Sequence, residues 1–242
     1  MDNRLKKIIE ESESIVFFGG AGVSTESGIP DFRSESGLYL AKQKYGYSPE
    51  EILSHTFFMD KTELFYEYYR SNMIFLEAKP NQAHITLARL EAQGKVKAVI
   101  TQNIDGLHTI AGSEIVYELH GSIRKNKCMK CNAKYNIEYI VNFKETIPRC
   151  EKCGGIIKPQ VVLYEEGLEE ATVKASVDSI SNADTLIVGG TSLVVYPAAG
   201  LLNYFKGKEI VLINKSETGY DHRATLVIKD SIGNVLSRDL LF

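Results

Sequence analysis

The sequence predicts an α/β fold in which helices cover both faces of a parallel sheet, joined to a smaller domain. Two observations predict the sheet: short apolar runs recur along the chain, and helical patterns separate several of them, for example at 81–91 and 197–205. The expected strands are 14–18, 96–100, 185–188, 209–213 and 224–228. A third observation predicts the smaller domain, because residues 34–80 and 122–158 interrupt this alternation.

Residues 34–80 lack a convincing strand and carry helix-start signals instead. Ser48 followed by Pro49 is typical of a helix N-terminus. Residues 60–63 resemble a capping box in front of the aromatic segment 64–69. We therefore expect a helical module here.

Composition and charge limit the classes of function. The chain has 242 residues, 44% of them hydrophobic, and a net charge of −3. This acidic balance argues against a protein that binds nucleic acid through bulk charge. No stretch approaches a membrane span, and the N-terminal MDNRLKKIIEESES is an amphipathic helix pattern without the apolar region of a signal peptide. We expect a cytoplasmic protein with no membrane partner.

The cysteines form a metal-binding pattern. Two C-x2-C pairs are separated by eighteen residues, and together they hold Cys128, Cys131, Cys150 and Cys153. Two disulfides or unrelated buried thiols are the alternatives, but the spacing and the expected compartment favour one zinc ion. Four thiolates leave no open coordination position, so the zinc is expected to be structural.

Glycine-rich and hydroxyl-rich turns follow three of the expected strands. The sequence Gly20-Ala21-Gly22 follows the first strand as an incomplete dinucleotide fingerprint, because Thr25 occupies the place of the third glycine. Thr191 and Ser192 follow another strand, and Asn214 follows a third. Ligands bind at this edge of an open parallel sheet. The acid that grips the ribose in dehydrogenases is missing, so hydride transfer fits poorly.

Two further segments supply candidate chemistry at the same edge. Gln102, Asn103 and Asp105 lie in one turn after the strand at 96–100. Such residues often only satisfy turn backbone, but three of them at a ligand edge favour binding, and a carboxylate there suits a nicotinamide. His120 ends another strand-like run, and its imidazole suits proton removal from a ribose hydroxyl.

Taken together, these segments resemble the sirtuins, in a bacterial-type minimal catalytic core. The resemblance rests on GAGVSTESGIPDFR (20–33), TQNID (101–105), HG (120–121), the four cysteines, GTSLVVYPAA (190–199) and the asparagine of LINKSET (212–218). It implies a Rossmann-type NAD-binding domain from 1–33, 81–121 and 159–242. It also implies a small domain made of a helical module, 34–80, and a zinc-ribbon module, 122–158. NAD and an acyl-lysine peptide would meet between the two domains.

The resemblance also assigns residues by position. It places Ala21, Thr25, Phe32 and Arg33 in the mobile cofactor loop and Gln102 at the nicotinamide ribose, while Asn103, Ile104 and Asp105 shape the nicotinamide pocket. It places Thr191, Ser192, Asn214 and Ile232 at the adenosine half of NAD. It places Val162 and Tyr164 at the acyl-lysine tunnel and Val194, Val195 and Tyr196 beside the peptide as a pairing strand.

The activity implied is that of an NAD-dependent protein-lysine deacetylase. The acyl oxygen attacks C1′ of the ribose and expels nicotinamide, His120 takes a proton from the ribose, and the products are free lysine, nicotinamide and 2′-O-acyl-ADP-ribose. A mono-ADP-ribosyltransferase, a deacylase for other acyl groups, a non-enzymatic NAD or zinc-ribbon module and a dehydrogenase are the alternatives. The partners expected are acylated-lysine proteins or peptides, and the chain is expected to be a monomer.

Two positions depart from the family pattern. Sirtuins often have Phe-Gly-Glu where this chain has Tyr164-Glu165-Glu166. Sirtuins that favour succinyl or malonyl groups have a tyrosine followed three residues later by arginine, whereas Tyr66 is followed at that spacing by Tyr69, with Arg70 one position further. One residue turns a helix by about 100°, so we expect Arg70 to miss the tunnel and the enzyme to prefer acetyl or other uncharged groups.

Overall fold

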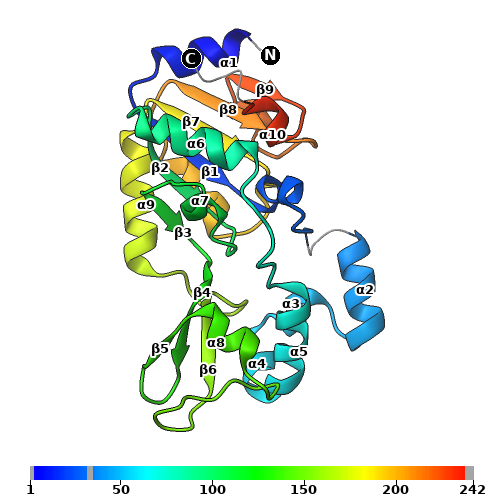
Figure 1. The fold of residues 1–242 in the computed structure, drawn as a ribbon. Coiled ribbons are helices and arrows are strands. Elements are labelled where there is room, and N and C mark those ends of the chain that lie inside the picture. Colours follow the sequence, from blue (N-terminus) through cyan, green and yellow to red (C-terminus); the bar gives the residue numbers. More distant parts are fainter. Residues whose placement is uncertain (1–2, 32–34, 238–242) are drawn as a thin grey trace.

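The computed structural model describes residues 3–31 and 35–237, which contain two sheets (Figure 1). The larger sheet has six strands, all parallel, in the order β3-β2-β1-β7-β8-β9. Its strands are β1 (Ile15–Gly19), β2 (Val96–Thr101), β3 (Val116–Glu118), β7 (Thr185–Gly189), β8 (Glu209–Ile213) and β9 (Leu226–Ile228). All five expected strands are present, and the predicted fold class is confirmed.

Helices cover both faces of this sheet. One face is covered by α1 (Asn3–Glu11), α6 (Gln82–Ala92) and α10 (Ile232–Val235), and the other by α9 (Glu170–Asn182) and the 3-10 helix η3 (Ala198–Tyr204). Alternate residues of β1 explain the two layers, because Ile15 and Phe17 pack into the first core while Val16 and Phe18 pack into the second. The helix expected at 197–205 is present as the 3-10 helix η3.

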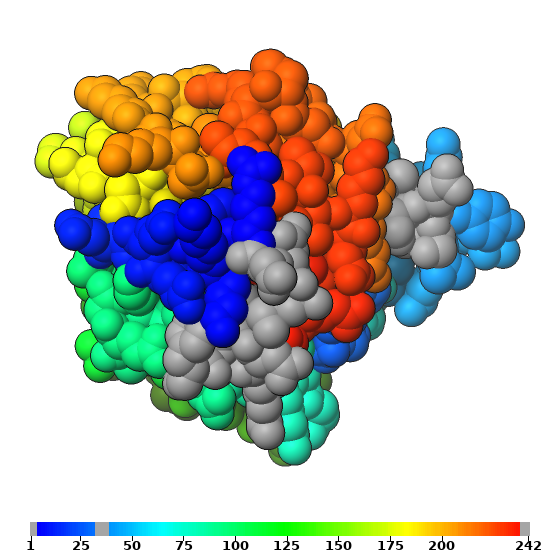
Figure 2. All heavy atoms as spheres, turned by 90° about the horizontal axis from the view of Figure 1, so that it is seen from above, coloured from blue at the N-terminus to red at the C-terminus, as the bar shows by residue number. Residues whose placement is uncertain are grey.

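The first helix closes the end of the molecule beside the last helix. Figure 2 shows the dark blue N-terminal residues against the orange and red residues that follow β8. Leu5 of α1 packs in one cluster with Leu226 and Ile232. The apolar stripe expected for the N-terminal helix thus supplies part of the core.

In its described residues, 35–80, the helical module contains four helices. They are α2 (Glu35–Tyr45), α3 (Pro49–Ile52), α4 (His55–Asp60) and α5 (Thr62–Asn72). Ser48 caps α3 as expected, because its Oγ accepts a hydrogen bond from Glu51 N and the Glu51 carboxylate accepts one from Ser48 N.

The capping box expected at 60–63 does not form. Asp60 is the last residue of α4, and Lys61 precedes α5 without a side-chain cap. The reason is that the two helices nearly join: Lys61 N donates to Phe57 O at 2.8 Å, and Thr62 Oγ1 donates to Phe58 O at 2.7 Å. Asp60 is therefore the last residue of α4, and it does not occupy the capping position of α5.

The second sheet lies in the lower half of Figure 1, beside these helices. Its three antiparallel strands are β4 (Gly121–Cys128), β5 (Lys134–Tyr135) and β6 (Ile157–Val161), in the order β5-β4-β6. The helix α8 (Ile137–Asn142) follows β5. Residues from both interruptions share one core, in which Phe65 and Tyr69 of α5 pack with Ile123 of β4 and Ile157 of β6. The two interruptions therefore form one small layer, and their exact domain boundaries stay a prediction.

Short helices occupy the loops near the strand ends. These are η1 (Ala21–Val23), η2 (Thr25–Ser27), α7 (Leu107–Ile110) and η4 (Asp221–Arg223). In the part of the chain that the structure describes, no helix has the length and apolar character needed to cross a membrane.

Two buried histidines lie between α6 and α7. The rings of His84 and His108 are 4.6 Å apart between centroids, and their side chains are essentially inaccessible. Burial lowers the pKa of His84 to about 4, and it lowers the pKa of His108 well below its ordinary value. Both rings are therefore neutral in the folded protein at neutral pH.

We expect this pair to make the protein sensitive to mild acid. Histidine in the unfolded chain has a pKa near 6.5, so the unfolded state gains protons below that pH while the folded state does not. The free energy of unfolding is therefore highest above pH 6.5 and falls towards pH 4. At pH 5 the loss is about 2 kcal/mol per histidine. Urea unfolding at pH 7 and pH 5 measures this loss.

A substitution separates the histidines from other titrating groups. His108→Phe should remove about half of this pH-dependent loss, because it leaves one of the two buried histidines in place. An unchanged difference between pH 7 and pH 5 in His108→Phe contradicts the assignment.

Candidate active site

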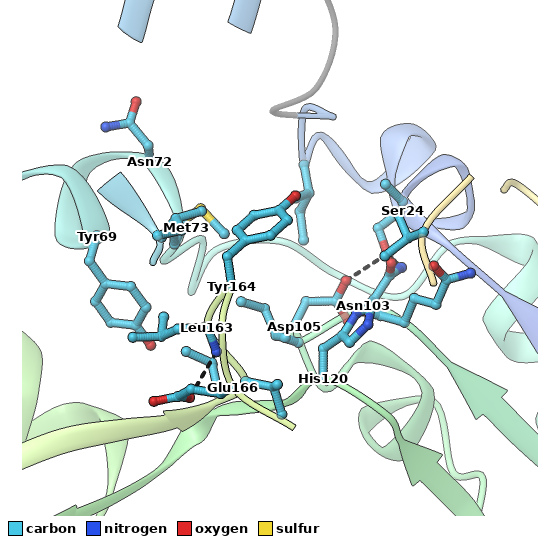
Figure 3. A pocket seen from close by; sticks show the side chains of 18 of the residues that line it. Ser24, Tyr69, Asn72, Met73, Asn103, Asp105, His120, Leu163, Tyr164 and Glu166 are labelled. Atoms are coloured by element: carbon cyan, nitrogen blue, oxygen red, sulfur yellow. Dashed lines mark hydrogen bonds between the residues drawn. The ribbon is translucent and has the colours of Figure 1, made fainter. Parts of the chain in front are cut away.

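A cavity of about 230 Å³ lies between the large sheet and the small layer, at the carboxyl ends of β1 and β2 (Figure 3). It brings together ten of the predicted site residues: Ala21, Gln102, Asn103, Ile104, Asp105, His120, Val162, Tyr164, Val195 and Tyr196. Thr25, Thr191, Ser192, Val194, Asn214 and Ile232 are not among the residues that line it. Phe32 and Arg33 lie outside the described residues.

The glycine loop after β1 is interlocked with the loop after β7. Gly22 N donates to Gly190 O at 2.8 Å, and a Cβ on Gly22 would lie 2.8 Å from Gly190 Cα. A Cβ on Gly190, whose φ is +60°, would lie 2.4 Å from Val23 N. These two glycines are required for contact between the loops, whether or not a phosphate also approaches them.

The loop contact places Thr191 next to Gln102. Gln102 Nε2 donates to Thr191 Oγ1 at 3.0 Å, and the same oxygen accepts a hydrogen bond from Leu193 N at 3.2 Å. Asn214 follows β8, and its Nδ2 donates to Ser216 O. Ile232 is 2% exposed, and its side chain fills the space above Gly189. Its predicted contact with NAD stays a prediction.

A three-residue cluster of polar side chains forms the inner corner of the cavity. Asn103 Nδ2 donates to Ser24 Oγ at 3.0 Å, and Ser24 Oγ donates to Asp105 Oδ2 at 2.7 Å. Leu107 N donates to the other carboxylate oxygen of Asp105 at 2.8 Å. Burial raises the pKa of Asp105 although these hydrogen bonds oppose the shift. The cluster holds Asp105 with one fixed orientation toward the cavity.

Ser24 is a site residue that we did not predict. It lies in the quoted glycine-rich segment, two residues after Gly22, and it is 1% exposed. Hydroxyl residues after a strand were the signal that singled out Thr191 and Ser192, and the same signal was available for Ser24.

His120 has a defined tautomer. Its Nδ1 lies 2.9 Å from Gln102 O, and since a carbonyl oxygen only accepts, Nδ1 carries the proton in the neutral ring. Nε2 is then the basic nitrogen. The next residue, Gly121, has φ +72°, and a Cβ there would lie 2.0 Å from Gln160 O. The His120-Gly121 pair therefore depends on close contact with β6.

The segment after β6 is the wall of the cavity opposite Asp105. Val162 N donates to His120 O at 2.9 Å, Tyr164 N donates to Leu53 O at 3.0 Å, and His55 N donates to Tyr164 O at 3.0 Å. Figure 3 shows the ring of Tyr164 in the middle of the cavity.

Glu165, which stands where sirtuins often have glycine, has a structural role in this chain. Its φ is +75°, a conformation that favours glycine, and its carboxylate accepts hydrogen bonds from Thr56 N at 2.9 Å and Thr56 Oγ1 at 2.8 Å. These two bonds lower the pKa of Glu165. They attach the cavity wall to the first turn of α4, which a glycine cannot do.

The residues predicted to pair with a peptide are exposed beside the cavity. Val194 is 68% exposed and Tyr196 is 66% exposed, and both Val195 and Tyr196 line the cavity. None of the three belongs to a strand of the structure. Two exposed apolar side chains at a cavity mouth fit the predicted role as an edge for an extended peptide, which stays a prediction.

The four cysteines converge to one point. Their Sγ atoms all lie within 4.8 Å of one another, with 3.5 Å between Cys128 and Cys153 and between Cys131 and Cys150. A tetrahedral zinc ion with Zn–S bonds of 2.3 Å puts its sulfurs about 3.8 Å apart. The geometry fits one structural zinc ion, and it does not fit disulfides, whose sulfurs are about 2 Å apart.

A parallel Rossmann-like sheet, a four-cysteine module and a histidine-bearing cavity between them define a class of proteins in which a large α/β part carries a small metal-binding part. Residues 20–197 match the model of the Sir2 family. The NAD-dependent protein deacetylase of Clostridium acetobutylicum is 65% identical over 234 residues, covering 97% of this chain and 96% of that protein. That of Staphylococcus aureus is 46% identical over 232 residues, covering 96% and 95%. This chain belongs to the Sir2 family, the sirtuins.

Solved structures agree with this assignment. A structure of Sir2 with a p53 peptide and NAD+ has a TM-score of 0.88 and 37% identity, covering 98% of this chain and 95% of that one. A complex of a Sir2 homologue with NAD has a TM-score of 0.89 and 38% identity, covering 99% and 93%. The resemblance stated from the motifs is confirmed.

Proposed function

We propose that this chain is an NAD-dependent protein-lysine deacetylase. The observation that supports this most directly is the shared cavity, in which the Asn103–Ser24–Asp105 cluster, His120 and the segment from Val162 to Tyr164 face one space. Relatives named NAD-dependent protein deacetylase are up to 65% identical over nearly the whole chain. The acyl group of an acyl-lysine peptide passes to ADP-ribose with the consumption of one water molecule, and free lysine, nicotinamide and 2′-O-acetyl-ADP-ribose are released.

NAD supplies an ADP-ribose with a leaving group, and the residues of this chain hold it in place. Ala21 and Thr25, with Phe32 and Arg33, act as the cofactor loop. Thr191, Ser192, Asn214 and Ile232 hold the adenosine half, and Gln102 holds the nicotinamide ribose. The hydrogen bond from Gln102 to Thr191 supports this assignment, because it fixes the amide at the edge of the sheet.

Asp105, Asn103 and Ile104 form the nicotinamide pocket. The ionised Asp105 carboxylate accepts a hydrogen bond from the carboxamide and stabilises positive charge as the glycosidic bond breaks. Ser24 Oγ and the backbone N–H of Leu107 each donate a hydrogen bond to one oxygen of Asp105. These two bonds fix the orientation of the carboxylate, whose remaining lone pairs can accept a hydrogen bond from the ligand.

His120 is the general base. Its Nδ1 proton is donated to Gln102 O, so Nε2 takes the proton from the ribose hydroxyl. The positive charge that develops on the ring is stabilised by the carbonyl oxygen on Nδ1. The backbone of Val162 and the ring of Tyr164 hold the acyl-lysine, and 194–196 pair with the peptide.

The test is a mass-spectrometric assay of NAD with an acetyl-lysine peptide. We expect nicotinamide, deacetylated peptide and O-acetyl-ADP-ribose in equal amounts, and no nicotinamide release above background with the unacetylated peptide. Nicotinamide release that is independent of the acetyl group, with ADP-ribose attached to protein, contradicts the proposal and indicates a mono-ADP-ribosyltransferase. We also infer a monomer that acts in the cytoplasm. We infer no nucleic-acid partner, which the net charge of −3 supports.

A further inference from the structure

Glu26 lies in the glycine loop after β1, and its carboxylate is bonded to a segment near the other end of the chain. Its Oε1 atom accepts a hydrogen bond from Ser231 Oγ at 3.0 Å, and its Oε2 atom accepts one from Gly233 N at 2.7 Å. These partners are 205 and 207 residues away in sequence. The carboxylate therefore bridges the helix η2 of the loop and the helix α10.

This bridge takes the place of the usual cap of α10. Ser231 is the N-cap residue, yet its side chain makes no capping hydrogen bond to its own helix. Glu26 instead accepts a backbone N–H of the first turn, which has no partner within the helix. Gly233 permits this approach, since a Cβ there would lie 2.6 Å from Glu26 Oε2. The loop thus supplies the cap that α10 does not make for itself.

Ile232, which the resemblance places at the adenosine half of NAD, lies between the two residues that Glu26 binds. Its side chain packs in one core cluster with Val23 of η1, and it fills the space above Gly189, the last residue of β7. Thr191 follows two residues later. The position of α10 against the loop therefore affects the groups predicted to hold adenosine.

The same loop also supports the nicotinamide pocket. Ser24 Oγ donates to Asp105 in the cavity (Figure 3). Asn81, the N-cap residue of α6, donates from Nδ2 to Val23 O at 2.7 Å and to Ser27 Oγ at 3.0 Å. In the described chain, the side-chain hydrogen bonds that join this loop to α10 both end on Glu26. The loop is therefore fixed on one side by Asn81 and on the other by Glu26.

The charge of Glu26 is unfavourable for the ligand itself. NAD carries two phosphates, and a carboxylate in the loop predicted to meet them repels the cofactor. Charge alone therefore predicts that NAD binds more tightly when Glu26 is removed. The bonds to α10 predict the opposite, because without them the groups that hold NAD lose their fixed spacing. The two roles can be told apart by the sign of the effect.

We propose that Glu26 is a positioning residue for NAD. Its carboxylate fixes α10 against the glycine loop, so that the groups predicted at the adenosine and nicotinamide halves keep one spacing before NAD arrives. Groups that are already in place bind a ligand more tightly, because less conformational freedom is lost on binding. The inference rests on the proposed function and assigns a role to a residue that is not among those lining the cavity.

Glu26→Ala removes the bridge. We expect the Kd for NAD, measured by calorimetry on the free protein, and the KM for NAD to rise about five- to thirtyfold. The kcat and the KM for an acetyl-lysine peptide should change less than about twofold. A loss of folded protein alone would lower the binding stoichiometry and the apparent kcat while leaving the Kd for NAD unchanged.

Two conservative variants separate the bridge from the charge. Glu26→Gln keeps the length of the side chain, and its amide can accept from Gly233 N and donate to Ser231 Oγ, so the Kd for NAD should stay within about twofold of the wild-type value. Glu26→Asp keeps the charge but is one methylene shorter, so it should weaken NAD binding about as much as Glu26→Ala. Glu67→Ala removes an exposed carboxylate of α5 and is the matched control, which should keep the wild-type Kd.

Ser231→Ala tests the bridge from the side of α10. It removes one of the two bonds and leaves the loop sequence intact, so we expect the Kd for NAD to rise about two- to fivefold. In the Glu26→Ala background it should have no further effect, because its partner is already gone.

An unchanged or lower Kd for NAD in Glu26→Ala overturns the inference, and so does a Kd in Glu26→Gln as weak as that in Glu26→Ala. Either result leaves the proposed function supported as long as the wild type shows acetyl-dependent turnover. Absence of that turnover in the wild type overturns the proposed function, and the Kd values of the variants still decide the role of Glu26.

Discussion

His120→Ala is expected to lower the kcat/KM for deacetylation by about 10²- to 10⁴-fold, the range that a positioned general base contributes. The variant loses the nitrogen that takes the ribose proton, and no other imidazole lines the cavity in the described chain. The fold should persist, because the backbone of residue 120 still accepts the hydrogen bond from Val162 N. Product formation measured by mass spectrometry, together with NAD affinity from calorimetry, checks both parts.

A comparison separates the loss of the base from a general loss of stability. His222→Ala, in the exposed helix η4, should keep wild-type turnover. NAD affinity should change by less than about threefold in His120→Ala, since the base acts on a proton and its removal affects catalysis more than binding. Turnover near the wild-type rate in His120→Ala would show that another group removes the proton.

Removing zinc is expected to abolish activity although the metal has no open coordination position. The strands β4 and β6 carry the metal module at one end and the active site at the other: His120 comes directly before β4, and Val162 directly follows β6. The pair Gly121 and Val161 closes that ladder, and Val162 N binds His120 O. Structural zinc in small modules contributes on the order of 10 kcal/mol to folding, so its loss separates these strands.

The measurement is zinc content, Tm and turnover before and after chelation and after adding zinc back. We expect about one zinc per chain, and all three quantities should fall and recover together. Cys150→Ser should give the same loss without a chelator. Lys152→Ser, at an exposed position between the second cysteine pair, is the control and should keep zinc, Tm and turnover. Full activity in metal-free protein would contradict a structural role for the site.

The large sheet and the metal site could be predicted from the sequence because each has a local signal. Buried parallel strands such as β1 and β7 are continuous apolar runs, and one tight turn fixes each cysteine pair. The order of strands and the joint core of the small layer have no such signal. Phe65 and Ile157 are 92 residues apart in sequence, and only the folded chain shows that they pack together.

Contacts between distant loops explain what the sequence could not show at the site. The glycine loop suggested a phosphate, yet Gly22 and Gly190 are also required by their mutual approach, 168 residues apart. Ser24 is defined by its bonds to Asn103 and Asp105, which are formed only when β1 and β2 are adjacent. In the same way, the meaning of Glu165 depends on Thr56, a residue of a different module.

The segment 162–165, which forms the wall of the cavity that contains Tyr164, is bonded to two different parts of the molecule. Its beginning is bonded to the loop of His120 through Val162, and its end is bonded to α4 through Tyr164 and through Glu165. Leu163 lies between these attachments. The short segment around Leu163 therefore joins the loop of His120 to α4, and the two attachments together set the position of this wall of the cavity.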